Sequence, residues 1–97
     1  MTQYSGPGSQ SALDAWDLGW EEYLSQLGYI VVCVDGRGTG GRGEAFRKAT
    51  YLQLGKYETI DQIETAIYLG SLPFVDANRI GIWGWSFGGY ISSSCMV

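Results

Sequence analysis

Ser86 lies at the centre of the pattern Gly84-Trp85-Ser86-Phe87-Gly88. Serine is a weak nucleophile unless it is exposed beside a base and near donors that can stabilise an oxyanion. A sharp turn from a strand into a helix provides such a position, and the glycines two residues away on either side permit that turn. The pattern therefore makes Ser86 the candidate nucleophile of a hydrolase elbow. The alternative is a glycine-rich turn in which Ser86 caps the following helix.

Elements on either side of Ser86 favour the elbow. Apolar spacing predicts an α/β arrangement in which helices cover a parallel sheet. A loop is expected over residues 1–10 and a short helix over 44–49. The main predicted elements are helices over about 14–27, 59–70 (begun by Thr59) and 87–96, and buried parallel strands over about 29–35 and 79–85.

The catalytic partners of Ser86 are missing from the chain. A serine hydrolase uses His as its base and usually an acid to orient that His, and with this elbow both follow the serine in the sequence. The 97 residues contain no His. We therefore expect a piece of a longer hydrolase domain, with Asp and His beyond residue 97, and we expect the isolated chain to be inactive. A degenerate hydrolase that has lost catalysis is the alternative.

A second glycine-rich segment spans residues 36–43. Gly36, Gly38 and Gly41 match the G-x-G-x-x-G spacing of dinucleotide sites. However, the helix predicted after them is short, and no second strand ends in an acidic residue at the required distance. Nucleotide binding is therefore disfavoured, and no cofactor or metal is expected.

Composition excludes several partners. The net charge is −4 and the basic residues are dispersed, which argues against nucleic-acid binding. No apolar run approaches the roughly 20 residues of a membrane span. Cys33 and Cys95 are expected to be small buried hydrophobes rather than a disulfide. Two strands with open edges make too small a sheet to be stable alone, so self-association is expected.

Four segments together carry a resemblance to a known family. They are Tyr4-Ser5-Gly6-Pro7-Gly8-Ser9-Gln10, Asp35-Gly36-Arg37-Gly38-Thr39-Gly40, Phe74-Val75-Asp76 and Arg79 to Tyr90. In this order they resemble the dipeptidyl peptidase IV group of the prolyl oligopeptidase family of serine peptidases, and the resemblance spans nearly the whole chain, from Tyr4 to Tyr90.

The resemblance implies a partial α/β-hydrolase fold in which Ser86 is the nucleophile. It implies that the Tyr4 hydroxyl and the Phe87 N–H form the oxyanion hole, although Tyr4 is expected to be poorly placed in a loop. The best-known members carry Tyr where this chain has Phe87. Trp85 is expected to pack and could flank the substrate. The segment Asp35-Gly36-Arg37 is expected to be loop architecture with a structural ion pair.

The resemblance also implies a function for the intact parent: a serine exopeptidase that releases N-terminal dipeptides from peptides, with Pro or Ala preferred before the cut. In the family a β-propeller holds the free N-terminus of the substrate, and this chain contains none of it. A secreted, periplasmic or cell-surface parent is expected. The alternatives are an acylaminoacyl peptidase or oligopeptidase of the same family, or a catalytically dead interaction module.

Overall fold

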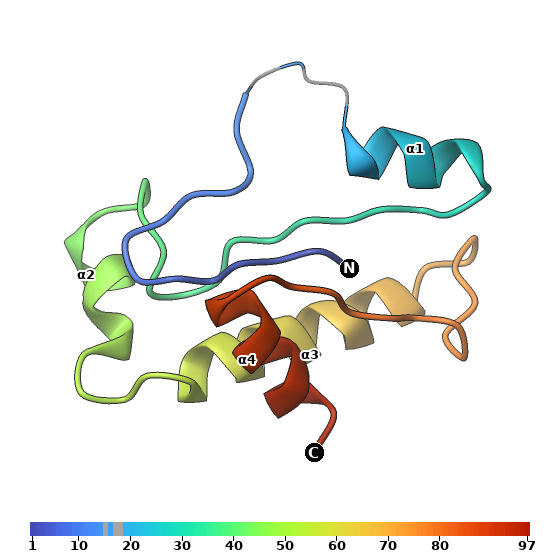
Figure 1. Cartoon of the computed structure of the whole chain (residues 1–97). Coiled ribbons are helices and arrows are strands. Elements are labelled where there is room, and N and C mark those ends of the chain that lie inside the picture. Colours follow the sequence, from blue (N-terminus) through green and yellow to red (C-terminus); the bar gives the residue numbers. More distant parts are fainter. Residues whose placement is uncertain (15, 17–18) are drawn as a thin grey trace.

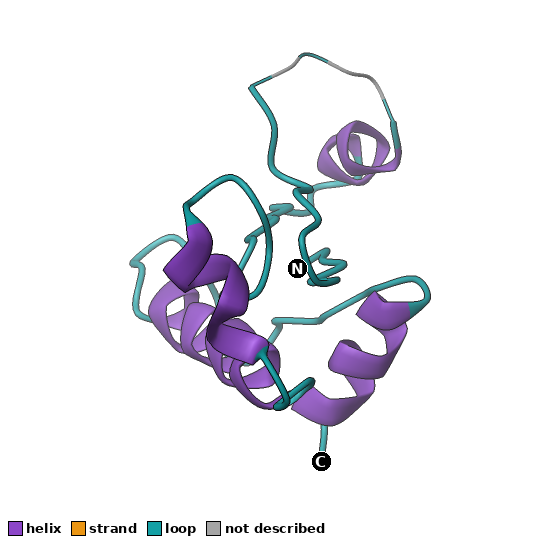
Figure 2. Ribbon diagram, turned by 90° about the vertical axis from the view of Figure 1, so that its left-hand side faces the viewer, coloured by secondary structure: helices purple, strands orange, loops and turns teal. Residues whose placement is uncertain are grey.

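The structure, a computed structural model, describes residues 1–14, 16 and 19–97 (Figure 1). Helices carry nearly all of its regular structure. They are α1 (Trp20–Gln26), α2 (Glu44–Arg47), the 3-10 helix η1 (Lys48–Thr50), α3 (Lys56–Gly70) and α4 (Phe87–Cys95). Helix α1 lies on one side of the extended segments, whereas α3 and α4 lie together on the other side (Figure 2). This layering is that of an α/β domain.

The two predicted strands are extended but do not form a sheet, so the prediction of strands was wrong for the described residues. Within the part of the chain that the structure describes, they pair through two isolated parallel bridges, which join Thr2 to Cys33 on one side and to Trp83 on the other. The N-terminal segment therefore lies between residues 29–35 and 79–85 (Figure 1). It leaves both neighbours after Gln3, because Ser5 adopts a φ of 61° and the chain turns at Pro7 and Gly8. A ladder cannot extend past this turn.

The helix predicted over 14–27 begins later than expected. Residues 15, 17 and 18 lie outside the described residues, while Asp14, Trp16 and Gly19 are not helical. Gly19 is extended at the N-cap of α1, and its N–H donates to Glu22 Oε2 at 2.7 Å. A glycine at the cap, rather than acidic residues further upstream, decides the start of this helix.

Helix α3 begins three residues before the predicted start at Thr59. Gly55 is the N-cap with a left-handed φ of 90°, and its N–H donates to Glu58 Oε2 at 3.1 Å. Thr59 instead donates its hydroxyl to the Gly55 carbonyl oxygen at 2.6 Å, one turn back inside the helix. The predicted end at Gly70 is confirmed, and α4 is one residue shorter than predicted. The short helix predicted over 44–49 continues as η1 after Arg47.

The interior of the described residues is mostly polar. Ile91 is their only fully buried hydrophobic residue, whereas Gln3, Ser5, Glu58 and Gln62 are at most 5% exposed. Many large apolar side chains face outward, among them Trp16 and Trp85. Among the described residues, every helix is too short or too polar to cross a membrane.

Candidate active site

Ser86 occupies the apex of the turn between residues 79–85 and helix α4. It is exposed, with φ 58° and ψ −118°, a conformation that a residue with a side chain seldom adopts. Its side chain makes no capping bond to α4. The alternative of a capping serine is therefore wrong, and the hydroxyl stays available for chemistry. Such strain at an exposed serine is typical of a functional site.

Neither Gly84 nor Gly88 has room for a side chain. A Cβ on Gly84 would collide with the backbone of Gly88, whose Cα would lie 2.8 Å away. A Cβ on Gly88 would collide with the Gln3 carbonyl oxygen and lie 3.1 Å from the Tyr4 Cα. The requirement for small residues on both sides of Ser86, which the spacing predicted, thus has a steric cause.

Phe87 is the first residue of α4, so its backbone N–H has no acceptor within the helix. The positive end of the helix dipole lies at this turn and favours a developing negative charge. The amide is therefore chemically suited to stabilise an oxyanion beside Ser86.

Tyr4 lies beside this turn, although it was expected to be poorly placed. Its ring packs edge-on against the Phe87 ring, with 6.2 Å between the ring centroids. The Gln3 N–H donates to the Trp83 carbonyl oxygen at 3.2 Å, which fixes the Tyr4 segment to the residues that lead into the elbow. The tyrosine is 40% exposed. The structure therefore brings Tyr4, Ser86 and Phe87 to one surface.

Trp85 precedes Ser86 and is 77% exposed, so the expectation that it packs is wrong within this chain. An indole in that position presents a broad apolar surface next to the candidate nucleophile. A substrate contact for Trp85 stays a prediction.

The ion pair predicted for the segment Asp35-Gly36-Arg37 is present. The Arg37 guanidinium contacts the Asp61 carboxylate, with Nη2 2.7 Å from Oδ1, and the Arg37 backbone N–H donates to Oδ2 at 2.7 Å. Burial raises the pKa of Asp61, but the bonds from Arg37 outweigh it and hold that pKa below its ordinary value. Asp35 accepts the N–H groups of Ser11 and Ala12 at 2.8–3.0 Å.

Protein groups fill the glycine-rich loop over 36–43. A Cβ on Gly36 would lie 2.9 Å from the Asp61 Cβ, and one on Gly38 would lie 2.6 Å from the Thr50 Cγ2. The Gly38 N–H donates to the Phe46 carbonyl oxygen at 2.9 Å. These glycines thus permit close packing of the loop on α3 and η1, which is the architectural role expected of them.

The cysteines form no disulfide. Cys33 and Cys95 are both free and partly buried, less than the predicted full burial. Burial raises the pKa of each thiol, so neither is an activated nucleophile at neutral pH.

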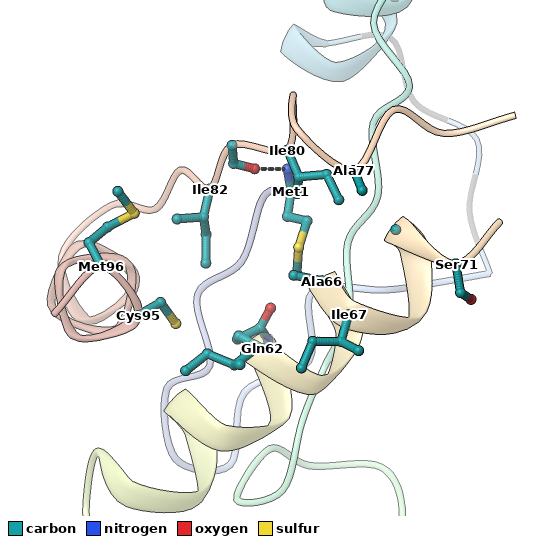
Figure 3. Close-up of a pocket in the computed structure, with 13 residues that line it drawn as sticks. Met1, Gln62, Ala66, Ile67, Ser71, Ala77, Ile80, Ile82, Cys95 and Met96 are labelled. Carbon is teal, nitrogen blue, oxygen red and sulfur yellow. Dashed lines mark hydrogen bonds between the residues drawn. The ribbon is translucent and has the colours of Figure 1, made fainter. Parts of the chain in front are cut away.

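An apolar cavity of about 620 Å³ lies between α3, α4 and residues 77–82 (Figure 3). Ile67, Ile80 and Ile82 contribute to its lining, as does the buried Gln62. Neither Ser86, Tyr4, Trp85 nor Phe87 lines it. The cavity is therefore separate from the candidate active site.

Sequence reasoning missed a buried hydrogen-bonded cluster behind Tyr4, formed by Gln3, Ser5, Gln62 and Ser92. The Gln3 side chain donates to the Gly88 carbonyl oxygen at 2.7 Å and to Ser92 Oγ at 3.0 Å. A polar residue at the boundary of the Tyr-x-Gly-Pro motif was the only signal in the sequence. The acceptors of its side-chain N–H groups, Gly88 and Ser92, lie more than 80 residues further along the chain, so no local pattern could indicate them.

An extended segment that turns sharply at an exposed serine into a helix, with helices on both sides, defines part of an α/β-hydrolase domain. The chain belongs to the prolyl oligopeptidase family, which matches residues 16–97.

The proteins to which this chain is similar are named as dipeptidyl peptidases or dipeptidyl aminopeptidases. The chain is 52% identical over 90 residues to a probable dipeptidyl-aminopeptidase B of Uncinocarpus reesii, covering 92% of this chain and 10% of that protein. It is 46% identical over 100 residues to a probable dipeptidyl peptidase 4 of Aspergillus flavus, covering 99% of this chain and 13% of that protein. The crystal structure of Porphyromonas gingivalis dipeptidyl peptidase 4 matches 97% of this chain with 60% identity and a TM-score of 0.94, and this chain spans 13% of that one.

Proposed function

We propose that this chain carries the nucleophile elbow of a serine exopeptidase that releases N-terminal dipeptides, with Pro or Ala preferred before the cut. The observation that carries the proposal is Ser86, exposed and strained at the start of α4, with no capping bond. The names of the similar proteins, which are dipeptidyl peptidases and dipeptidyl aminopeptidases, favour this activity over the acylaminoacyl peptidase and oligopeptidase alternatives.

In the proposed reaction Ser86 Oγ attacks the carbonyl carbon of the substrate's second residue. The hydroxyl proton passes to a His that we place beyond residue 97, together with an orienting Asp. The Phe87 N–H and the Tyr4 hydroxyl donate to the oxyanion. The C–N bond then breaks, the leaving amine takes the proton from the His, and the acyl-enzyme on Ser86 is hydrolysed by water. No step needs a metal or cofactor.

The remainder of the enzyme is part of the proposal. Because the chain spans about a tenth of the length of its relatives, we place a propeller domain and the C-terminal part of the peptidase domain outside it. The isolated chain would be inactive, because the base that activates Ser86 is missing.

A grafted peptidase tests the proposal. In it, the segment of Porphyromonas gingivalis dipeptidyl peptidase 4 that matches this chain is replaced by residues 1–97. We expect release of dipeptides from an Ala-Pro or Gly-Pro amide and stoichiometric labelling of Ser86 by a fluorophosphonate. A Ser86→Ala graft that still hydrolyses the amide would refute the role of Ser86. A well-folded graft without hydrolysis or labelling would favour the inactive interaction module.

A further inference from the structure

We propose that Gln3 is a positioning residue of this active site. Its buried side-chain amide holds Tyr4 against the start of α4, so that the Tyr4 hydroxyl and the Phe87 N–H converge on one oxyanion. The inference rests on the proposed function, because Tyr4 matters for catalysis only if Ser86 is the nucleophile.

Gln3 joins the Tyr4 segment to both sides of the elbow. Its backbone N–H donates to the Trp83 carbonyl oxygen at 3.2 Å, before Ser86 in the chain. Its side chain donates to the Gly88 carbonyl oxygen and to Ser92 Oγ, after Ser86. Three bonds from one residue therefore tie the segment before Tyr4 to the elements that hold the nucleophile.

The direction of these hydrogen bonds is determined by their acceptors. A carbonyl oxygen can only accept, so the Gln3 Nε2 must face Gly88, and Oε1 must face Ser5. Ser5 Oγ then donates to Gln3 Oε1 at 2.7 Å. The Gln62 Nε2 donates to the Val34 carbonyl oxygen at 3.0 Å and approaches Ser5 Oγ at 3.4 Å, a weaker contact.

The cluster also holds a strained backbone. Ser5 has a φ of 61° although it carries a side chain, and it is 2% exposed. Such a conformation persists only where surrounding contacts determine it. The bond from Ser5 to Gln3 supplies one of these contacts, so loss of the Gln3 amide would release the turn that follows Tyr4.

Burial makes the Gln3 contacts specific. Gln3 is 5% exposed, so water cannot readily replace its partners. The Gly88 carbonyl would lose a donor in the dry interior if the amide were removed. The Tyr4 ring could then move relative to Phe87, and a displacement of about 1 Å in a positioned group can reduce a rate by about 100-fold.

The test is Gln3→Met in the grafted peptidase, because methionine has a similar length but cannot make these hydrogen bonds. We expect kcat to fall by about 10- to 100-fold with little change in KM, because an oxyanion donor acts in the transition state. Gln53→Met makes the same atomic change at an exposed residue of the loop before α3 and is expected to leave both parameters unchanged.

A double-mutant cycle separates positioning from a general structural effect. If Gln3 acts through Tyr4, then Gln3→Met should change kcat by no more than about 2-fold in a Tyr4→Phe background. An equal loss in both backgrounds, a change confined to KM, or wild-type kinetics would overturn the inference.

A milder variant keeps the test decisive if Gln3→Met fails to fold. Ser92→Ala removes one of the two acceptors of the Gln3 amide, and we expect kcat to fall by about 2- to 10-fold in the wild-type background only. Failure of this inference is distinguishable from failure of the proposed function. If Ser86→Ala is inactive while Gln3→Met and Ser92→Ala behave like wild type, only the positioning role is wrong.

Discussion

Replacing Gly84 with alanine should disrupt the turn that carries Ser86. A Cβ at this position would lie 2.8 Å from the Gly88 Cα and closer still to the Gly88 carbonyl. These are backbone atoms at the start of a helix, so no side-chain rotation relieves the collision. Overpacking typically costs about 1–3 kcal/mol, and we expect the upper end because backbone must move. At about 1.4 kcal/mol per factor of ten, this cost would lower the equilibrium ratio of the intact turn to a displaced one by about 100-fold.

Gly89→Ala is the matched control, because it adds the same methyl group in the first turn of α4, just after the elbow. Its Cβ would lie 3.4 Å from the Gly84 carbonyl oxygen, which is an ordinary contact. Alanine is also favoured over glycine within a helix by up to about 1 kcal/mol. The two substitutions should therefore have opposite effects on the stability of the elbow, although they lie only five residues apart.

The assay is fluorophosphonate labelling of Ser86 in the grafted peptidase, together with its thermal midpoint. We expect Gly84→Ala to label about 100-fold more slowly, in line with the cost of moving backbone. We expect Gly89→Ala to label at the wild-type rate with an unchanged or higher midpoint. Equal labelling rates and equal midpoints for the two variants would refute the steric account of the elbow.

Three further predictions follow from the site and its surroundings. The isolated chain should not be labelled at Ser86, because the base is missing, and rapid stoichiometric labelling would contradict this. The isolated chain should self-associate at micromolar concentration, because its extended segments are unpaired along much of their length and large apolar residues are exposed; a monomer by light scattering would count against it. Because its native pKa is lowered, ionised Asp61 stabilises the fold above a pH of about 4, and that contribution is lost as the pH falls through the native pKa. Arg37→Ala should therefore destabilise the grafted peptidase by about 1 kcal/mol at pH 7, a modest value because the pair is partly exposed. If the difference in unfolding free energy between the wild type and this variant is equally large well below a pH of about 4, the ionised Asp61 carboxylate is not its cause.

The sequence alone determined the position of the candidate nucleophile, Ser86. Gly84 and Gly88 are spaced around Ser86 as the turn requires. For Gly84 this requirement is local, because its Cβ would collide with Gly88, four residues away, whereas the atoms that a Cβ on Gly88 would meet belong to Gln3 and Tyr4 at the other end of the chain. The helix end at Gly70 was also decided locally, because Pro73 follows it and cannot continue a helix. The family assignment rested on four short motifs. The match over residues 16–97 confirms the prolyl oligopeptidase family and includes three of these motifs.

The tertiary structure decided what lies between the two predicted strands. Nothing in residues 1–10 has the apolar pattern of a strand, yet Thr2 bridges Cys33 and Trp83. That pairing depends on hydrogen bonds from the backbone, which every residue can offer, so side-chain patterns could not reveal it. The strands themselves did not form, because the N-terminal segment turns away after Gln3.

The surroundings of Tyr4 were likewise beyond the sequence. Local pattern made Tyr4 part of a loop, whereas its position beside Phe87 depends on Gln3, whose side-chain partners Gly88 and Ser92 are at the other end of the chain. The sequence thus indicated the candidate nucleophile, because the pattern around Ser86 is local. Only the tertiary structure decided how Tyr4 is held beside the elbow, because the hydrogen-bond acceptors of the buried Gln3 amide are near it in space and not in the sequence.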